Sequence, residues 1–249
     1  MLVPQKVASK RGWHKTFISN DSALQKQSSM LDQLESSVDM AEAQLKQAIS
    51  AHEPDAPKLF NADLSLNTCP DKMKEITEYF MKTLNRSHTS SKLRPIRVYN
   101  ITLDGMKSAF EKDGANMKDI RLLWHGTRVF NILSILKGGM VVPKSGGSIH
   151  VKGRMFGDGL YFSNQSTKSL NYAQGYWDGG PKDNNCFMFL CDVAMGDYHV
   201  PRNSDSQLHK KGHDSIWAKP GQSGIQNDEM IVFRTSQVNI RYLVEFSDK

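Results

Sequence analysis

The sequence predicts an α+β fold in which helices come first and most strands follow. Before residue 85, apolar residues recur at intervals of three, four and seven, which is the spacing of one helix face. After Pro95, apolar residues fall instead into short runs that are typical of strands. Because the two kinds of segment are grouped rather than alternating, the pattern disfavours a repeating parallel βαβ sheet. A chain of 249 residues with 39% hydrophobic content is large enough to bury such a core.

The first 18 residues show no clear apolar period, so residues 1–18 are expected to form a flexible basic tail. Basic and aromatic side chains mix there: Lys6, Lys10, Arg11, Trp13, His14 and Lys15. Such a cluster is usually a solvated tail and less often a nucleic-acid contact or a localisation signal. The net charge of +6 and the pI near 9.1 add little support for a nucleic-acid contact, since the excess of positive charge is modest and spread along the chain.

A long amphipathic helix is predicted after Asn20 and Asp21, which are good N-cap residues. Its apolar face comprises Leu24, Leu31, Leu34, Val38, Ala41, Leu45 and Ala48. The seven-residue spacing also fits a coiled coil, but the segment covers only about four heptads. Packing against another part of the same chain is therefore favoured, because helicity in water depends mainly on tertiary packing.

The remaining elements follow from shorter patterns. A second helix is predicted to begin at Pro70, with Met73, Ile76, Phe80 and Leu84 on its buried side. Strands are predicted at residues 96–101, 122–124, 187–193, 230–233 and 238–246, with helices at residues 129–137 and 166–174.

Composition also limits the chemistry. The cysteines, Cys69, Cys186 and Cys191, form no CxxC pair, so the sequence supports neither a zinc site nor a disulfide framework. It has no apolar run long enough to span a bilayer and no secretory signal pattern. We therefore expect a soluble intracellular protein that uses no metal and binds no membrane.

A glycine turn stands before a strand at residues 153–163, GRMFGDGLYFS. The segment lacks the third glycine of a dinucleotide-binding loop and precedes a strand rather than a helix, which argues against that kind of site. Gly157 and Gly159 instead fit a sharp turn into the strand. Tyr161 on this strand and Tyr172 on the next helix could face each other around a flat aromatic ligand, or simply meet in the core.

Four separated segments, taken in order, resemble the poly(ADP-ribose) polymerases, which are diphtheria-toxin-like ADP-ribosyltransferases. They are RLLWHGT, MFGDGLYFS, TKSLNYA and EMIVFRTSQVNIRYLVEF. The resemblance implies a split antiparallel sheet with NAD⁺ bound between its halves. It also implies an enzyme that cleaves the nicotinamide–ribose bond and transfers ADP-ribose to protein side chains, and to growing ADP-ribose chains.

The resemblance places the catalytic set at His125, Tyr161 and Glu229. His125 is expected to donate a hydrogen bond to a hydroxyl of the adenosine ribose. The carboxylate of Glu229 is expected to lie near the ribose 2′-hydroxyl, where it would stabilise the oxocarbenium character of the transition state. It would also orient the acceptor hydroxyl for attack.

The resemblance also implies a binding site for NAD⁺ as co-substrate. The backbone of Gly126, which has no Cβ, and the hydroxyl of Ser169 would hold the carboxamide. Tyr161 and Tyr172 would stack on the nicotinamide ring. Lys168 lies beside them in the sequence and would help to bind donor or acceptor.

The expected organisation is a tail at residues 1–18, a partial helical regulatory segment at residues 19–66 and a catalytic domain at residues 67–249. Val141 stands where many members have an arginine that helps to hold the donor, which implies a lower affinity for NAD⁺. The loop before Glu229 is shorter than in long-chain polymerases, which leaves transfer of one or a few units open, whereas Glu229 itself argues for elongation. The expected partners are protein acceptors, the chain itself included, and DNA through the basic tail or through domains outside this chain. The resemblance implies a nuclear location and a role in DNA repair. The alternatives are a catalytically weak NAD⁺- or ADP-ribose-binding module, a mono-ADP-ribosyltransferase and a nucleic-acid-binding scaffold.

Overall fold

The computed structural model describes residues 20–21, 24–25, 28–29, 31, 62–142, 155–178, 182–205 and 212–248. The chain divides into two compact units, Met1–Leu59 and Phe60–Lys249. Of the long helix predicted after Asn20, the described positions from Asp21 to Leu31 are helical. The rest of that helix and the predicted basic tail lie outside the described residues.

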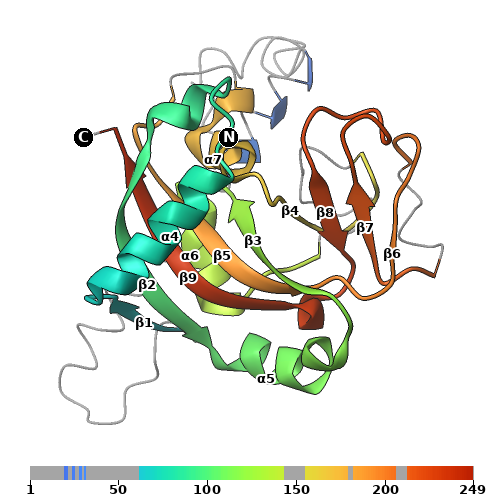
Figure 1. The fold of residues 1–249 in the computed structure, drawn as a ribbon, viewed down its shortest axis with the longest axis horizontal. Coiled ribbons are helices and arrows are strands. Elements are labelled where there is room, and N and C mark those ends of the chain that lie inside the picture. The colour runs from blue at the N-terminus through green and yellow to red at the C-terminus, as the bar shows by residue number, and fades with distance from the viewer. Residues whose placement is uncertain are drawn as a thin grey trace, which may run out of the picture. The chain divides into compact units, whose positions relative to one another are not determined.

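The strands of the second unit form two sheets (Figure 1). The five-stranded sheet has the order β1 (Ala62–Leu66), β2 (Arg94–Leu103), β9 (Val238–Ser247), β5 (Asn185–Ala194) and β3 (Ile120–Gly126). The four-stranded sheet has the order β4 (Leu160–Phe162), β8 (Glu229–Val232), β7 (Ser215–Ala218) and β6 (Tyr198–His199). Neighbouring strands run antiparallel, except that β6 and β7 are parallel. The predicted α+β class with a split antiparallel sheet is confirmed.

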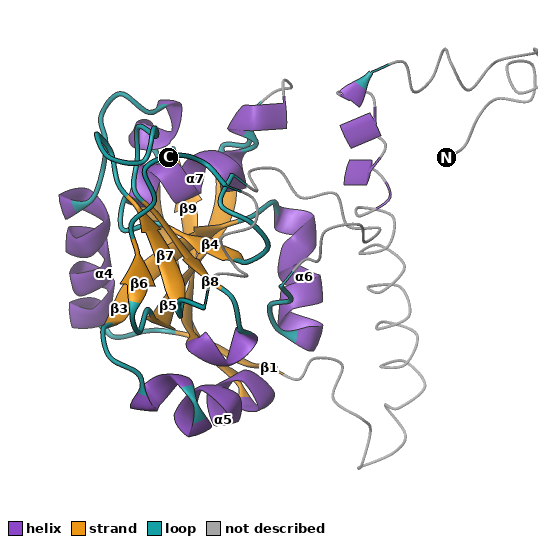
Figure 2. Ribbon diagram, turned by 90° about the vertical axis from the view of Figure 1, so that its right-hand side faces the viewer, coloured by secondary structure: helices purple, strands orange, loops and turns teal. Residues whose placement is uncertain are grey.

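Four α-helices accompany the sheets within the described part of this unit: α4 (Pro70–Lys82), α5 (Asp104–Lys112), α6 (Val129–Gly138) and α7 (Ser166–Gln174). Short 3₁₀ turns lie between them, namely η1 (Thr89–Lys92), η2 (Gly114–Asn116), η3 (Tyr176–Asp178) and η5 (Thr235–Gln237). Figure 2 shows α4 and α6 on opposite faces of the five-stranded sheet.

The core covers both faces of the central strands, because side chains alternate along a strand. A register shift in β5 between Leu190 and Cys191, opposite Tyr242 and Ile240, changes which residues of β9 face each side. In β9, Val238 and Ile240 belong to the apolar cluster that also contains Ile132 of α6. Val244 and Phe246 of the same strand belong to the cluster that contains Ile76 and Phe80 of α4. The central strands of the five-stranded sheet are therefore buried on both faces and form the frame of this unit.

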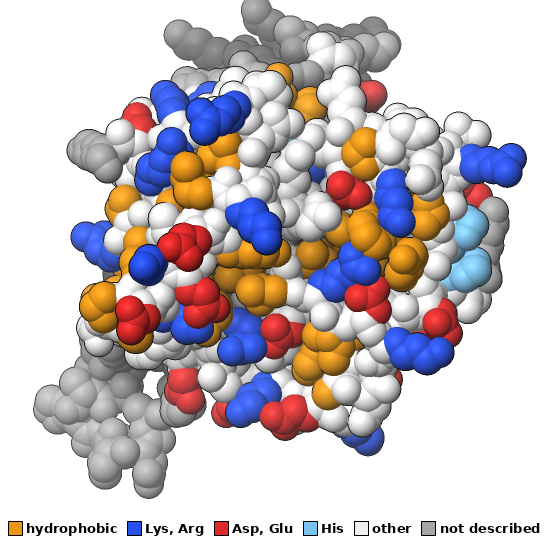
Figure 3. Space-filling model, in the orientation of Figure 1, with side chains coloured by type: hydrophobic (Ala, Val, Ile, Leu, Met, Phe, Trp, Pro, Cys, Tyr) orange, Lys and Arg blue, Asp and Glu red, His pale blue; other side chains and the backbone are white. Residues whose placement is uncertain are grey.

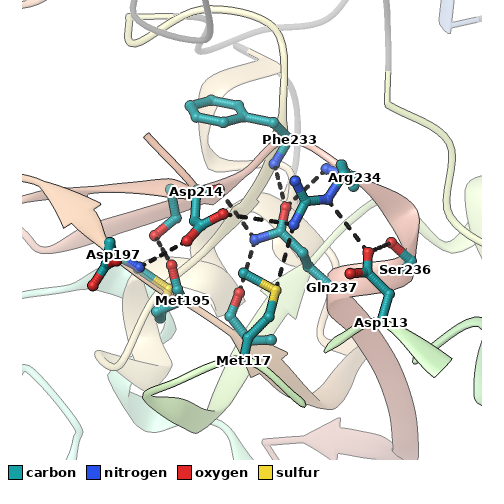
Figure 4. Close-up of polar contacts among 11 residues, drawn as sticks. Asp113, Met117, Met195, Asp197, Asp214, Phe233, Arg234, Ser236 and Gln237 are labelled. Carbon is teal, nitrogen blue, oxygen red and sulfur yellow. Dashed lines mark hydrogen bonds and ion pairs between the residues drawn. The ribbon is translucent and has the colours of Figure 1, made fainter. Parts of the chain in front are cut away.

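The two sheets meet at one isolated bridge between Trp124 of β3 and Ser163, the residue after β4. Each backbone N–H donates to the other carbonyl at 3.0 Å. A second polar network, around Gln237 of η5, joins the connection between β8 and β9 to Ala194 at the end of β5 and to Asp214 just before β7 (Figure 4). These contacts hold the short strands of the second sheet against the frame.

The segment before the catalytic domain differs from the sequence analysis at one point. Residues 62–66 were assigned to the helical regulatory segment, but they form β1, which pairs with β2 along Ala62–Leu66. Four of the five residues of β1 are exposed, so the strand has no buried alternation that could have predicted it. The predicted boundary between regulatory segment and catalytic domain otherwise stays a prediction.

Candidate active site

His125 lies near the end of β3, where its ring packs against Phe162 and Phe189 at centroid distances of 5.4 and 6.5 Å. Its Nδ1 is 2.9 Å from the backbone carbonyl oxygen of Tyr161. Because a carbonyl oxygen only accepts, Nδ1 carries the proton. Burial lowers the pKa of the imidazole below its usual value, so the ring is neutral near pH 7 and Nε2 is a hydrogen-bond acceptor.

This tautomer reverses the direction of one predicted hydrogen bond. The sequence analysis expected His125 to donate to a ribose hydroxyl, whereas in the structure a hydroxyl would donate to Nε2. The reason is tertiary: the carbonyl group that accepts the hydrogen bond from Nδ1 belongs to Tyr161 of β4, 36 residues further along the chain.

Gly126 ends β3 at a point where α7 comes unusually close. A Cβ at this position would lie 1.7 Å from the carbonyl oxygen of Ser169, far inside any possible contact. The hydroxyl of Ser169 in turn donates to the carbonyl of Trp124 at 3.0 Å. The sequence analysis explained this glycine by the approach of a ligand, but the structure shows that the packing of α7 on β3 already requires it.

Glu229 is the first residue of β8 and is only 8% exposed. One of its carboxylate oxygens, Oε1, forms an ion pair and hydrogen bond with Nζ of Lys168 on α7. The other oxygen, Oε2, is buried and accepts no hydrogen bond from the described residues. Burial lowers the pKa of Lys168, and the charge of Glu229 opposes that shift.

Tyr172 lies one turn after Lys168 on α7 and within the electrostatic range of Glu229. Burial raises the pKa of Tyr172 to about 12, and the charge of Glu229 contributes to the increase. The phenol is therefore neutral at physiological pH. Its ring also contacts Trp177 at a centroid distance of 6.2 Å.

Tyr161 closes the glycine turn that precedes its strand. Its hydroxyl donates to the carbonyl of Gly157 at 2.8 Å and accepts from the N–H of Phe156 at 3.1 Å. Gly157 has a φ of 95°, in the region that favours glycine, as the predicted sharp turn requires. Tyr161 lies opposite Ile231 of β8, two residues beyond Glu229.

The structure thus brings the predicted residues onto four neighbouring elements. β3 carries His125 and Gly126, β4 carries Tyr161, α7 carries Lys168, Ser169 and Tyr172, and β8 carries Glu229. β3 contacts β4 and α7, and β4 pairs with β8. The roles of these residues in binding and catalysis stay predictions.

Several polar residues beside this site were missed by the sequence analysis. Nδ1 of His88 lies 3.0 Å from Oγ1 of Thr167. Burial lowers the pKa of this imidazole, and the neighbouring cation of Lys168 also lowers it. Asp228 precedes Glu229 and accepts a hydrogen bond from Trp217. Only Asp228 had a local signal, as a second carboxylate next to the predicted catalytic one. His88 is 79 residues from Thr167, so no sequence spacing could have placed it.

Comparison with known proteins bears directly on this arrangement. Residues 71–226 match the family model of the poly(ADP-ribose) polymerase catalytic domain. The chain belongs to this family. It therefore carries the catalytic domain of an NAD⁺ ADP-ribosyltransferase. The match includes β3, β4 and α7 but ends three residues before Glu229, so the assignment of that carboxylate rests on the sequence pattern and on the geometry of the site.

Individual poly(ADP-ribose) polymerase relatives agree with the family match. The chain is 32% identical over 140 residues to the putative poly [ADP-ribose] polymerase-like 100L of Invertebrate iridescent virus 6, covering 52% of this chain and 72% of the viral protein. It is 30% identical over 163 residues to protein mono-ADP-ribosyltransferase PARP4 of Mus musculus, covering 61% of this chain and 8% of the mouse protein. Poly [ADP-ribose] polymerase 1 of Oryza sativa subsp. japonica is 29% identical over 206 residues, or 71% of this chain and 20% of the rice protein.

The described residues contain neither a membrane-spanning helix nor a cluster suited to a metal ion. No helix in the described ranges has the length and apolar character needed to cross a bilayer. The same residues contain no group of three or more histidine, cysteine, aspartate or glutamate side chains placed to hold a metal ion. The expectation that the reaction uses no metal stays a prediction.

Proposed function

We propose that this chain cleaves the nicotinamide–ribose bond of NAD⁺ and transfers the ADP-ribose to protein side chains, its own included. The observation that carries the proposal is the state of Glu229. Its carboxylate is buried, one oxygen is held by Lys168, and the other has no partner among the described residues. A buried acceptor of this kind is unusual in a folded protein and fits a site that a ligand completes.

Four side chains of the site have the following chemical roles in this proposal. Oε2 of Glu229 would accept a hydrogen bond from the ribose 2′-hydroxyl, and its charge would stabilise the developing oxocarbenium ion. Lys168 would fix the orientation of that carboxylate. His125 would accept a hydrogen bond from a hydroxyl of the adenosine ribose through Nε2. The neutral ring of Tyr172 would stack on the nicotinamide.

Elongation of an ADP-ribose chain needs the same carboxylate to orient a second kind of acceptor, a ribose hydroxyl. We include elongation in the proposal for that reason. One observation favours transfer of a single unit instead. The loop between β7 and β8 has ten residues, 219–228, and is closed on itself by the Ser223 N–H donating to the Lys219 carbonyl at 2.9 Å. So short a loop provides little surface to hold an existing chain.

We also propose that the chain contacts DNA, is located in the nucleus and acts in DNA repair. The basic cluster before residue 16 and the family resemblance support contact with DNA, a nuclear location and a role in DNA repair. Binding to broken DNA that weakens steeply with salt would support the contact. Binding that is absent at low salt would refute it.

The decisive experiment incubates the purified chain with labelled NAD⁺ and resolves the protein on a gel. The wild-type chain should become labelled and release nicotinamide, whereas Glu229→Ala should do neither while it is still folded at the assay temperature. The melting temperature of this variant should nevertheless fall, because Lys168 loses its buried partner. A smear of label indicates polymer, and a sharp band indicates single units. Calorimetric binding of NAD⁺ without nicotinamide release would refute the transferase and support a pure binding module.

A further inference from the structure

We infer that the indole of Trp217 is a positioning group for Glu229 and Lys168, which acts through the carboxylate of Asp228. The inference rests on the proposed function, because it concerns the same site. Trp217 lies on β7 opposite Met230, and the next residue, Ala218, lies opposite Glu229. Its Nε1–H donates to Oδ1 of Asp228 at 2.7 Å, a short hydrogen bond to a charged acceptor.

The indole itself is held by three neighbouring side chains. The guanidinium carbon of Arg121 is 4.0 Å from the centroid of the Trp217 ring, and Nζ of Lys219 is 3.9 Å from it. Tyr198 meets the same ring edge-on at 5.3 Å. Figure 3 shows lysine and arginine side chains around apolar ones on this face, over β7 and β8. Cations at these distances are attracted to the ring face and restrict its movement.

Arg121 is also fixed in its turn. Its Nε and Nη2 each donate to the carboxylate of Asp119 at 2.7 Å. A bidentate pair of this kind fixes the plane of the guanidinium group as well as its position. The hydrogen bond from Trp217 to Asp228 therefore starts from a side chain with little freedom to move.

Asp228 is fixed at both its side chain and its backbone. While Oδ1 accepts from Trp217, the carbonyl oxygen of Asp228 accepts from Oγ of Ser163 at 2.9 Å. Ser163 is the residue that bridges the two sheets through Trp124. The peptide group whose oxygen is held by Ser163 also contains the nitrogen of Glu229, so these contacts set the backbone from which the candidate catalytic carboxylate projects.

The carboxylate of Asp228 also acts on Lys168 by its charge. Burial lowers the pKa of Lys168, and the charges of Glu229 and Asp228 raise it by a smaller amount. His88 is a further titratable group that interacts electrostatically with Lys168. Asp228 therefore helps to keep Lys168 protonated and paired with Glu229. Without Asp228 the ammonium group would lose its proton at a lower pH.

Two substitutions separate the hydrogen bond from the charge. Trp217→Phe keeps an aromatic ring for the two cations but removes the N–H donor. Asp228→Asn keeps an oxygen that can accept from the indole but removes the charge. Tyr198→Phe is the matched control, because it touches the same indole and leaves this hydrogen bond intact. The assay is nicotinamide release by the whole chain from about pH 6 to about pH 10, with melting temperatures recorded in parallel.

Both test variants should lower kcat roughly tenfold, with KM for NAD⁺ changed by less than about twofold, as expected for one charge-assisted hydrogen bond. In Asp228→Asn, the alkaline limb of the pH profile should also shift to lower pH. The reason is that Lys168 acts as a cation and its pKa falls when the charge of Asp228 is removed. The double variant should be no worse than the more severe single one. Tyr198→Phe should match the wild-type chain.

The outcomes distinguish this inference from the proposed function. A wild-type chain that releases no nicotinamide refutes the proposed function, and this inference with it. An active wild-type chain with unchanged kcat and pH profile in both test variants refutes the inference alone. A loss of activity that follows a fall in melting temperature, with the pH profile unchanged, also refutes it, since that result indicates only a structural role for Trp217.

Discussion

Glu229 and Gln237 lie at the two ends of one short segment, and both are buried polar side chains with opposite hydrogen-bonding states. The carboxamide of Gln237 uses all of its hydrogen-bonding positions. Its Nε2 donates to the carbonyls of Ala194 and Asp214 at 2.9 and 3.1 Å, and its Oε1 accepts from the N–H groups of Phe233 and Arg234 at 3.2 and 3.1 Å (Figure 4).

Glu229, in contrast, has one carboxylate oxygen on Lys168 and the other without a partner among the described residues. Leaving a buried acceptor unpaired is unfavourable, and the fold avoids it at Gln237 a few residues away. The difference indicates two kinds of polar burial. The network at Gln237 is complete in the protein alone and serves stability, whereas the pair at Glu229 is incomplete until a ligand with a hydroxyl donor arrives.

The largest expected effect on stability comes from breaking the buried ion pair between Lys168 and Glu229. Lys168→Met would leave the carboxylate of Glu229 charged, buried and unpaired, which should lower the free energy of unfolding by about 3 kcal/mol. Urea denaturation measures this. The double variant Lys168→Met with Glu229→Gln removes both charges and should recover most of the loss. A single variant as stable as the wild-type chain would show that the pair is not buried as the structure has it.

A somewhat smaller loss of stability is expected from breaking the hydrogen-bond network at Gln237. Gln237→Leu would remove the four hydrogen bonds that the carboxamide makes to backbone groups and should lower the free energy of unfolding by about 2 kcal/mol. Because Gln237 does not touch the candidate site, kcat measured well below the melting temperature should stay near the wild-type value. Gln222→Leu, at an exposed glutamine, is the matched control and should be neutral in both assays. Loss of kcat at unchanged stability would contradict the division between the two regions.

The smallest expected effect concerns the rim of the Gln237 network. Arg234 forms ion pairs with Asp113 and Asp214 at 3.4 and 3.6 Å, but its side chain is 49% exposed. Solvent screens such pairs, so Arg234→Met should change the free energy of unfolding by only about 0.5 kcal/mol. Denaturation at low and high salt provides the check, because the difference between variant and wild type should shrink as salt rises. A loss comparable to that of Gln237→Leu would mean that the ion pairs, rather than the carboxamide, hold the network.

The sequence predicted the elements that carry strong local signals. The bounds of α7 agree with the prediction at residues 166–174, because a polar start and the glycine at position 175, with a φ of 78°, define both ends. The strands β5 and β9 have long apolar runs and were also found. By contrast, α5 and β7 were not predicted. The helix α5 follows β2 without a loop and buries only Met106 and Phe110, and β7 has only four residues. Short elements like these depend on tertiary contacts for their conformation.

At the candidate site, the sequence identified the residues but not the contacts between them. The motifs located His125, Tyr161, Lys168, Tyr172 and Glu229, all of which lie on adjoining elements. They could not show that Nδ1 of His125 donates to a carbonyl 36 residues away, or that Lys168 pairs with a carboxylate 61 residues away. These contacts decide which atoms are free to meet a substrate, and they follow from how the two sheets come together rather than from spacing along the chain.

In our proposal, Oε2 of Glu229 serves the chemical step rather than the binding of NAD⁺. The most direct test compares Glu229→Gln with the wild-type chain in two assays, nicotinamide release and calorimetric binding of a non-hydrolysable NAD⁺ analogue. The variant should bind the analogue with an affinity close to that of the wild-type chain, while its rate of nicotinamide release falls by about 10²–10³-fold. A variant that releases nicotinamide at the wild-type rate would contradict the claim.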